Sequence, residues 1–256
     1  ILVTGEDHLG HGKSVAEGGI FGYFCEQDPA TVVVRDVHRL KKITEESYPE
    51  VPYVILGHSM GSFIARNYLC RYGKGIDGAV IVGTGMQSRG LILCSKAMAG
   101  IQKLFCGSKH VSHFIDKAAF GGYNKRIDTP RTASDWLSRN TENVDRYIAD
   151  ELCGFTFTVN GFQTLFELIG RLQKKENLEK VPQNLPMLMV SGAEDPVGDY
   201  GRGVTKACDS LKKAGVKNIT VKLYENDRHE LLNEEDGEQA MEDIYQWIRK
   251  EIPAFV

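Results

Sequence analysis

The sequence Gly-His-Ser-Met-Gly at residues 57–61, with the pattern G-x-S-x-G, most constrains how this chain can fold. Residues 53–56 before it are apolar and typical of a buried strand. Residues 62–72 after it contain no Pro or Gly and end at Gly73, which predicts a helix with a glycine C-cap. A strand, a sharp turn and a helix in this order place the serine on a strained turn, with its Oγ exposed at the carboxyl edge of a sheet.

The same turn predicts where a negative charge could be stabilised. Gly57 and Gly61 let the strand and the helix approach closely, because a side chain at either position would collide with its neighbours. The backbone N–H of Met60 then lies at a helix start, where N–H groups lack acceptors within the helix. We therefore predict Ser59 as a nucleophile and the Met60 N–H as an oxyanion donor. The pattern alone also occurs by chance, so its strand and helix context carries the argument.

Composition narrows the classes of protein to which the chain can belong. Its 256 residues are enough for one large domain or two small ones, and its net charge of −3 argues against a nucleic-acid partner. No apolar run approaches the roughly 20 residues that span a bilayer. Six cysteines without a C-x-x-C pair indicate reduced thiols rather than disulfides or a metal site, so we expect a cytoplasmic protein. No secretion signal is visible, but the first residue is Ile1 and the true start can lie upstream.

The beginning of the chain predicts a strand followed by a glycine-rich loop. Residues 1–6 are mostly apolar and read as the strand, and residues 7–14 form the loop. Gly-Lys-Ser at residues 12–14 is similar to the end of a phosphate-binding P-loop. That motif needs a glycine where Asp7 stands and a helix where residues 15–28 carry three glycines. A tight loop leaving a strand is therefore the better interpretation.

Strands and helices then alternate on both sides of a different middle region. Short apolar runs predict strands at 78–83, 186–192 and 218–224, and apolar spacing predicts helices at 28–48, 201–214 and 235–250. In the last helix, residues 241, 244, 245 and 248 are expected to share one apolar face. This alternation predicts an α/β fold with a mostly parallel sheet and helices on both faces. We see no internal repeat.

The middle region, residues 86–185, lacks this alternation and is rich in aromatic residues. Helix-like runs occupy residues 91–105, 114–120, 134–150 and 161–175. We expect one domain with a core at 1–85 and 186–256, and a helical cap at 86–185 over a substrate pocket. The alternative for each aromatic side chain is packing within the core. The aromatic residues concerned include Phe105, Phe114, Phe120, Trp136, Phe155, Phe157, Phe162 and Phe166.

A serine nucleophile needs a base and a group that orients the base. Asp195 follows the predicted strand at 186–192, and His229 follows the strand at 218–224. Ser59, Asp195 and His229 thus occur in the order Ser, acid, His and all lie at the carboxyl ends of strands, where ligands bind in open α/β sheets. Pro196 fixes the turn beside Asp195, which favours that residue over its acidic neighbours at positions 194 and 199. The carboxylate at 227 is too near His229 in sequence to orient it easily.

These motifs together resemble an α/β-hydrolase of the monoacylglycerol lipase and lysophospholipase branch, a serine aminopeptidase-like family. The resemblance is carried by Asp-His-Leu-Gly-His-Gly-Lys-Ser at 7–14, by the G-x-S-x-G pattern at 57–61, by Asp-Pro-Val at 195–197 and by His229. It covers the sequence on both sides of the expected cap, which itself is not diagnostic. It implies hydrolysis of carboxylic esters with a hydrophobic acyl group, a small-molecule ester or lipid substrate, and no cofactor.

One departure from the family concerns the oxyanion hole. The resemblance implies a further strand and a His-Gly loop before residue 7, and that loop supplies the second oxyanion N–H. This chain begins at the following strand, so we expect the loop to lie upstream of Ile1 in a longer protein.

The sequence leaves two other functions open. A peptidase, a thioesterase or an acyltransferase could use the same three residues, because leaving-group choice depends on the pocket. A non-catalytic ligand-binding protein could also retain the fold, although the complete set of three residues argues against it. Oligomeric state and acyl chain length are not predicted.

Overall fold

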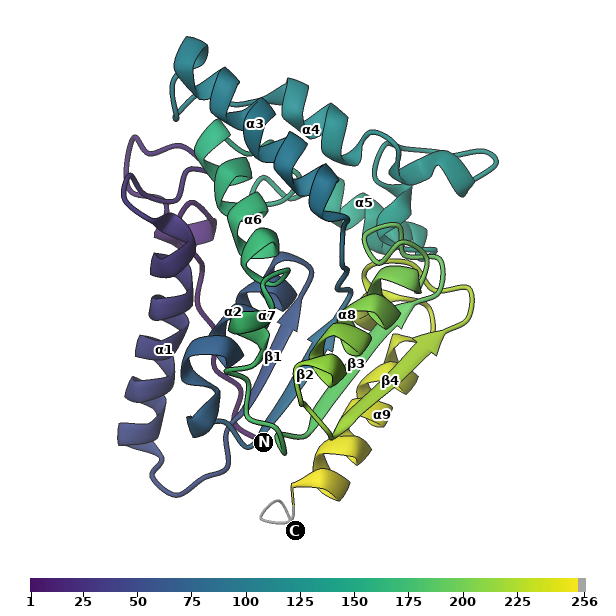
Figure 1. Cartoon of the computed structure of the whole chain (residues 1–256). Coiled ribbons are helices and arrows are strands. Elements are labelled where there is room, and N and C mark those ends of the chain that lie inside the picture. Colours follow the sequence, from purple (N-terminus) through teal and green to yellow (C-terminus); the bar gives the residue numbers. More distant parts are fainter. Residues whose placement is uncertain (253–256) are drawn as a thin grey trace. The chain divides into compact units, whose positions relative to one another are not determined.

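The computed structural model describes residues 1–252, and these form two compact units (Figure 1). The first unit comprises residues 1–49, 87–122 and 147–170. The second comprises residues 50–86, 123–146 and the chain from 171 onward. Segments distant in sequence thus make up each unit. The division into a core and a cap at 86–185 stays a prediction.

The second unit is built on a parallel sheet. Its strands are β1 (Val54–His58), β2 (Gly78–Val82), β3 (Met187–Gly192) and β4 (Ile219–Tyr224), and they pair in this order within the described residues. Each strand was expected from its apolar run, and β2 and β3 are buried along their whole length. Because all four strands run in the same direction, their carboxyl ends meet at one edge of the sheet.

Helices cover both faces of this sheet, as predicted. Gly57 of β1 lies opposite Ile81, and a Cβ at Gly57 would stand 2.3 Å from the carbonyl oxygen of Gly61, so α2 (Met60–Tyr72) packs closely on that face. The helix α8 (Arg202–Lys213) contacts β3 and β4, and α9 (Gly237–Glu251) lies across the sheet from it (Figure 1). Gly73 ends α2 in a right-handed conformation, so its freedom to adopt positive φ is not used.

The buried face of α9 differs from the predicted one. Ala240, Ile244 and Trp247 pack against alternate residues of β2 and β3, whereas Met241 and Tyr245 are exposed by 48% and 37%. Positions 240, 244 and 247 also share a helix face, and turning that face inward buries the indole of Trp247. Since the indole is the largest apolar group on α9, its burial outweighs that of Met241.

The first unit is mainly helical, with α1 (Pro29–Ser47), α3 (Arg89–Cys106), α4 (His113–Phe120) and α6 (Val159–Arg171). The Asp28 side chain caps α1 by accepting the Thr31 N–H, and Pro29 begins the helix. The predicted strand at 1–6 is wrong: these residues have no strand pairing, and Val3 is 85% exposed. An apolar run forms a strand only when a partner strand accepts its backbone hydrogen bonds, which periodicity does not reveal.

The predicted helix at 134–150 is interrupted. A 3-10 turn at Asp135–Leu137 precedes α5 (Thr141–Ala149), and residues 138–140 between them are not helical. Ser138 Oγ and the Arg139 N–H both donate to Glu234, which holds the backbone away from a helical path. The remaining short elements are α7 (Lys175–Leu178) and 3-10 turns at Gly12–Ser14, Gly73–Gly75, Tyr123–Arg126 and Leu231–Asn233. Within residues 1–252 no helix is both long and apolar enough to cross a membrane.

Candidate active site

Ser59 stands on the sharp turn between β1 and α2. Its backbone has φ 55° and ψ −122°, a conformation that is strained for a residue with a side chain. Its N–H donates to the carbonyl of Val82 at 3.1 Å, which ties the turn to the end of β2. Met60 is the first residue of α2, so its N–H has no acceptor four residues earlier within the helix. The turn thus presents a hydroxyl next to a backbone donor.

Asp195 is completely buried after the carboxyl end of β3. Its Oδ1 accepts the Val197 N–H at 2.8 Å, and its Oδ2 accepts the Ser191 hydroxyl at 3.2 Å. Burial by itself would raise the pKa of Asp195, but His229 and these two donors together hold that pKa below its usual value. The side chain is therefore an ionised acceptor at neutral pH.

His229 follows β4 and is also buried, with 2% of the residue exposed. Its Nδ1 lies 3.0 Å from Asp195 Oδ2. Since an ionised carboxylate only accepts hydrogen bonds, His229 donates from Nδ1 and its Nε2 carries the lone pair. This is the tautomer that a general base for a serine hydroxyl requires.

His58, which precedes Ser59, holds the backbone of His229. The two ring centroids are 4.7 Å apart, and His58 Nε2 donates to the His229 carbonyl oxygen at 2.9 Å. Desolvation, helped by the neighbouring imidazole of His229, lowers the pKa of His58 to about 4. His58 is therefore neutral at pH 7 and adds no charge beside the candidate base.

Gly83 leaves the space in which these two rings meet. It directly follows β2 with φ +57°, and a Cβ there would come within 3.1 Å of the His58 ring and 3.2 Å of His229 Cε1. Both the backbone conformation and the close approach of the rings thus require glycine at this position. The sequence patterns did not predict the roles of Gly83 and His58. The one available signal was that Gly83 directly follows a buried strand.

Three predicted residues therefore lie at the carboxyl ends of three strands. Asp195 and His229 are hydrogen-bonded, and the ring of His229 packs against the residue preceding Ser59. Within residues 1–252, the His229 ring has no hydrogen bond to the Ser59 hydroxyl, and such contacts commonly tighten only when substrate binds. The assignment of catalytic roles stays a prediction.

The other carboxylates considered from the sequence have different partners. Asp227 Oδ1 accepts from Arg139 Nη2 at 2.6 Å, and Asp199 Oδ1 accepts from Arg202 Nη2 at 2.7 Å. Glu194 is exposed and makes no hydrogen bond to His229 within the described chain. In residues 1–252, no group of three or more His, Cys, Asp or Glu side chains could hold a metal ion.

Two aromatic residues complete the surroundings of His229. The Trp136 ring lies 5.2 Å from the His229 ring, and the Tyr123 ring lies 4.9 Å from Trp136 in an edge-on arrangement. Burial, followed by the negative charge of Asp195, raises the pKa of Tyr123. The Glu230 N–H donates to the Leu137 carbonyl at 2.7 Å, which fixes this segment against the loop after β4. Periodicity could not show that these aromatic residues contact the candidate base.

Comparisons with known proteins agree with this arrangement. Residues 1–236 match the model of the Hydrolase_4 family, described as serine aminopeptidase, S33. The chain is 28% identical to monoglyceride lipase from Mus musculus over 258 residues, which cover 99% of this chain and 75% of that protein. It is 24% identical to monoacylglycerol lipase from Mycolicibacterium smegmatis over 250 residues, which cover 97% of this chain and 78% of that protein.

A solved structure extends the agreement to three dimensions. The thermostable carboxyl esterase from Bacillus coagulans superposes with a TM-score of 0.88 at 29% identity. The alignment covers 96% of this chain and 79% of that one. Sheet order, the strained serine turn and the family match point to the same conclusion. The chain belongs to the serine aminopeptidase-like S33 family of α/β-hydrolases.

Proposed function

We propose that this protein cleaves carboxylic esters of hydrophobic acyl groups, such as monoacylglycerols or lysophospholipids, through Ser59, His229 and Asp195. The family assignment makes the chain a carboxylic ester hydrolase, and the named lipases among its relatives support a lipid substrate. The observation that carries the proposal is the buried 3.0 Å contact between His229 Nδ1 and Asp195, at the sheet edge where Ser59 is strained. We also propose a cytoplasmic location and a cap formed by residues 86–185.

In the proposed reaction, His229 Nε2 takes the proton of the Ser59 hydroxyl as Oγ attacks the ester carbonyl. Asp195 accepts the Nδ1–H throughout and stabilises the imidazolium that forms. The Met60 N–H donates to the developing oxyanion. His229 then protonates the departing alcohol, which leaves an acyl group on Ser59. Water attacks this acyl-enzyme with His229 as base, releasing the acid and restoring the hydroxyl.

A substrate panel tests the proposal. We expect kcat/KM to rise from short to medium acyl p-nitrophenyl esters, by up to about fourfold per added methylene, because each buried methylene contributes about 0.8 kcal/mol. We also expect monoacylglycerols to be cleaved and aminoacyl amides to be poor substrates. Higher kcat/KM for aminoacyl amides or for acyl thioesters would establish peptidase or thioesterase activity instead. No turnover of any substrate by folded protein would favour a non-catalytic binding protein.

A further inference from the structure

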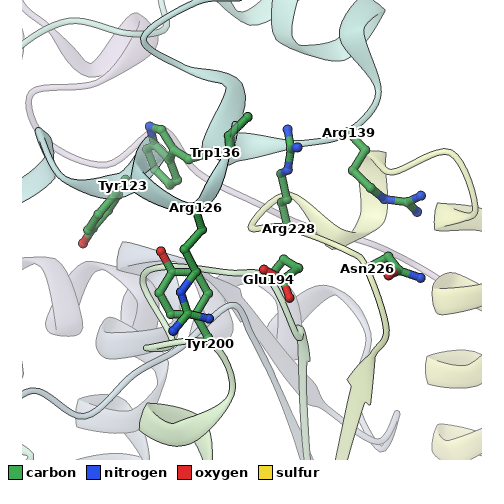
Figure 2. A pocket seen from close by; sticks show the side chains of 9 residues that line it. Tyr123, Arg126, Trp136, Arg139, Glu194, Tyr200, Asn226 and Arg228 are labelled. Atoms are coloured by element: carbon green, nitrogen blue, oxygen red, sulfur yellow. The ribbon is translucent and has the colours of Figure 1, made fainter. Parts of the chain in front are cut away.

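A cavity of about 260 Å³ lies within the second unit beside the candidate acid and base (Figure 2). Glu194, immediately before Asp195, and Arg228, immediately before His229, both line it. Trp136 lines it as well and packs on the His229 ring. Small-molecule pockets usually measure about 300–1,000 Å³, so this cavity suits a single small group. Ser59 is not among the residues that line this cavity.

Three of the nine lining residues are arginines, and they differ in how many of their N–H donors already have an acceptor. Arg139 donates to Asp227 at 2.6 Å and to Asp236 at 3.2 Å, so its charge is compensated. Arg228 donates from Nη1 to the carbonyl oxygens of Asp135 and Ser138. Its Nη2 and Nε have no protein acceptor among residues 1–252.

Arg126 has the most available guanidinium. It lies flat over the ring of Tyr200, with Cζ 3.4 Å from the ring centroid (Figure 2). Across residues 1–252 its nitrogen atoms have neither an ion-pair partner nor a hydrogen-bond acceptor. Stacking on an aromatic face holds the planar fork in one orientation, so little conformational freedom remains to be lost when an anion binds. Arg126 thus offers an oriented and unused cation at the cavity.

The charges of the cavity lining that have no ion-pair partner within residues 1–252 favour the binding of an anion. Arg126 and Arg228 supply two positive charges with open N–H donors, against the carboxylate of Glu194 in the lining. A planar guanidinium fork binds two oxygens of a phosphate at once, and a second guanidinium can reach another oxygen of the same group. We propose that this cavity binds a small phosphate group, either inorganic phosphate or the phosphate of a glycerol phosphate head group. Phosphate binding does not depend on the proposed function. The assignment of the phosphate to a lipid head group rests on that function.

Tryptophan fluorescence provides the test, because Trp136 lines the cavity while Trp247 belongs to α9 and is buried against the sheet. Titration of the purified protein with inorganic phosphate at constant ionic strength should give a saturable change. Arg126→Ala should weaken the apparent affinity by about tenfold or more, the expected loss for charge-assisted hydrogen bonds. The matched control is Lys125→Ala, which removes an adjacent exposed cation outside the lining and should leave the affinity unchanged. Calorimetry on Trp136→Phe should still detect binding.

Parallel titrations identify the source of the phosphate. Equal affinities for inorganic phosphate and glycerol 3-phosphate would assign the site to free phosphate, and a preference of tenfold or more for glycerol 3-phosphate would assign it to a head group. The absence of saturable phosphate binding, or equal weakening in both arginine and lysine variants, would overturn the proposal. Ser59→Ala should bind phosphate like the parent protein. Activity retained in that variant would therefore refute the proposed nucleophile without affecting the phosphate site.

Discussion

Replacing Ser59 with Ala is expected to lower kcat for a p-nitrophenyl ester by on the order of 10⁶-fold, as loss of the nucleophile does in a well-studied serine protease. Without the hydroxyl no acyl-enzyme can form, and the Met60 N–H and substrate binding supply only the residual rate. Ester hydrolysis at saturating substrate measures the change. The thermal unfolding temperature of the variant should stay near that of the parent, since only one small hydroxyl is removed from a half-buried turn.

The control for this variant is another serine of the second unit. The Ser210 hydroxyl donates to the Lys206 carbonyl within α8, and Ser210→Ala should retain the parent kcat. A Ser59→Ala protein that hydrolyses the ester at more than a hundredth of the parental rate, with contaminating esterase excluded, would show that another residue carries the acyl group.

Replacing Asp195 with Asn is expected to lower kcat by about 10⁴-fold at pH 7 while the protein stays folded. The amide –NH₂ would donate to His229 Nδ1, which moves the imidazole proton to Nε2 and removes the lone pair that must accept the serine proton. The ring would also lose the negative charge that stabilises its protonated form. Steady-state kinetics on the same ester measure the loss.

The matched control is Asp199→Asn, which removes a nearby carboxylate that pairs with Arg202 instead of His229. We expect its kcat to lie within about twofold of the parent value, because an exposed ion pair contributes little. Equal losses in the Asp195 and Asp199 variants would show that general changes in this loop, rather than orientation of the imidazole, control the rate.

The candidate catalytic residues could be placed from the sequence because each follows a recognisable apolar strand. In a parallel sheet, the loops that follow β1, β3 and β4 begin at one edge, whatever the rest of the chain does. The close strand–helix approach expected of the two glycines around Ser59 is confirmed at Gly57. It is wrong for Gly61, because a Cβ there would meet no atom within 4 Å. Chain order and local turn chemistry were therefore sufficient to place Ser59, Asp195 and His229 after the carboxyl ends of three strands.

Other features depend on contacts that no local pattern encodes. The exposed residues 1–6 have a strand-like composition but no strand pairing, and the inward face of α9 is decided by the size of Trp247. Glu234 interrupts the predicted helix at 134–150 by accepting a hydrogen bond from the Ser138 hydroxyl, although the two residues are 96 positions apart. The packing of Trp136 on His229 and the stacking of Arg126 on Tyr200 are likewise tertiary.

Labelling with a fluorophosphonate probe, followed by peptide mass spectrometry, tests the central claim most directly. The reagent reacts with a serine whose hydroxyl is activated by a base and whose phosphonyl oxygen is stabilised by oxyanion donors. We predict one adduct per chain, located on Ser59, absent from Ser59→Ala and formed much more slowly in Asp195→Asn. Folded parent protein that remains unlabelled, or that carries its adduct on another serine, would contradict the assignment of these side chains as one catalytic unit.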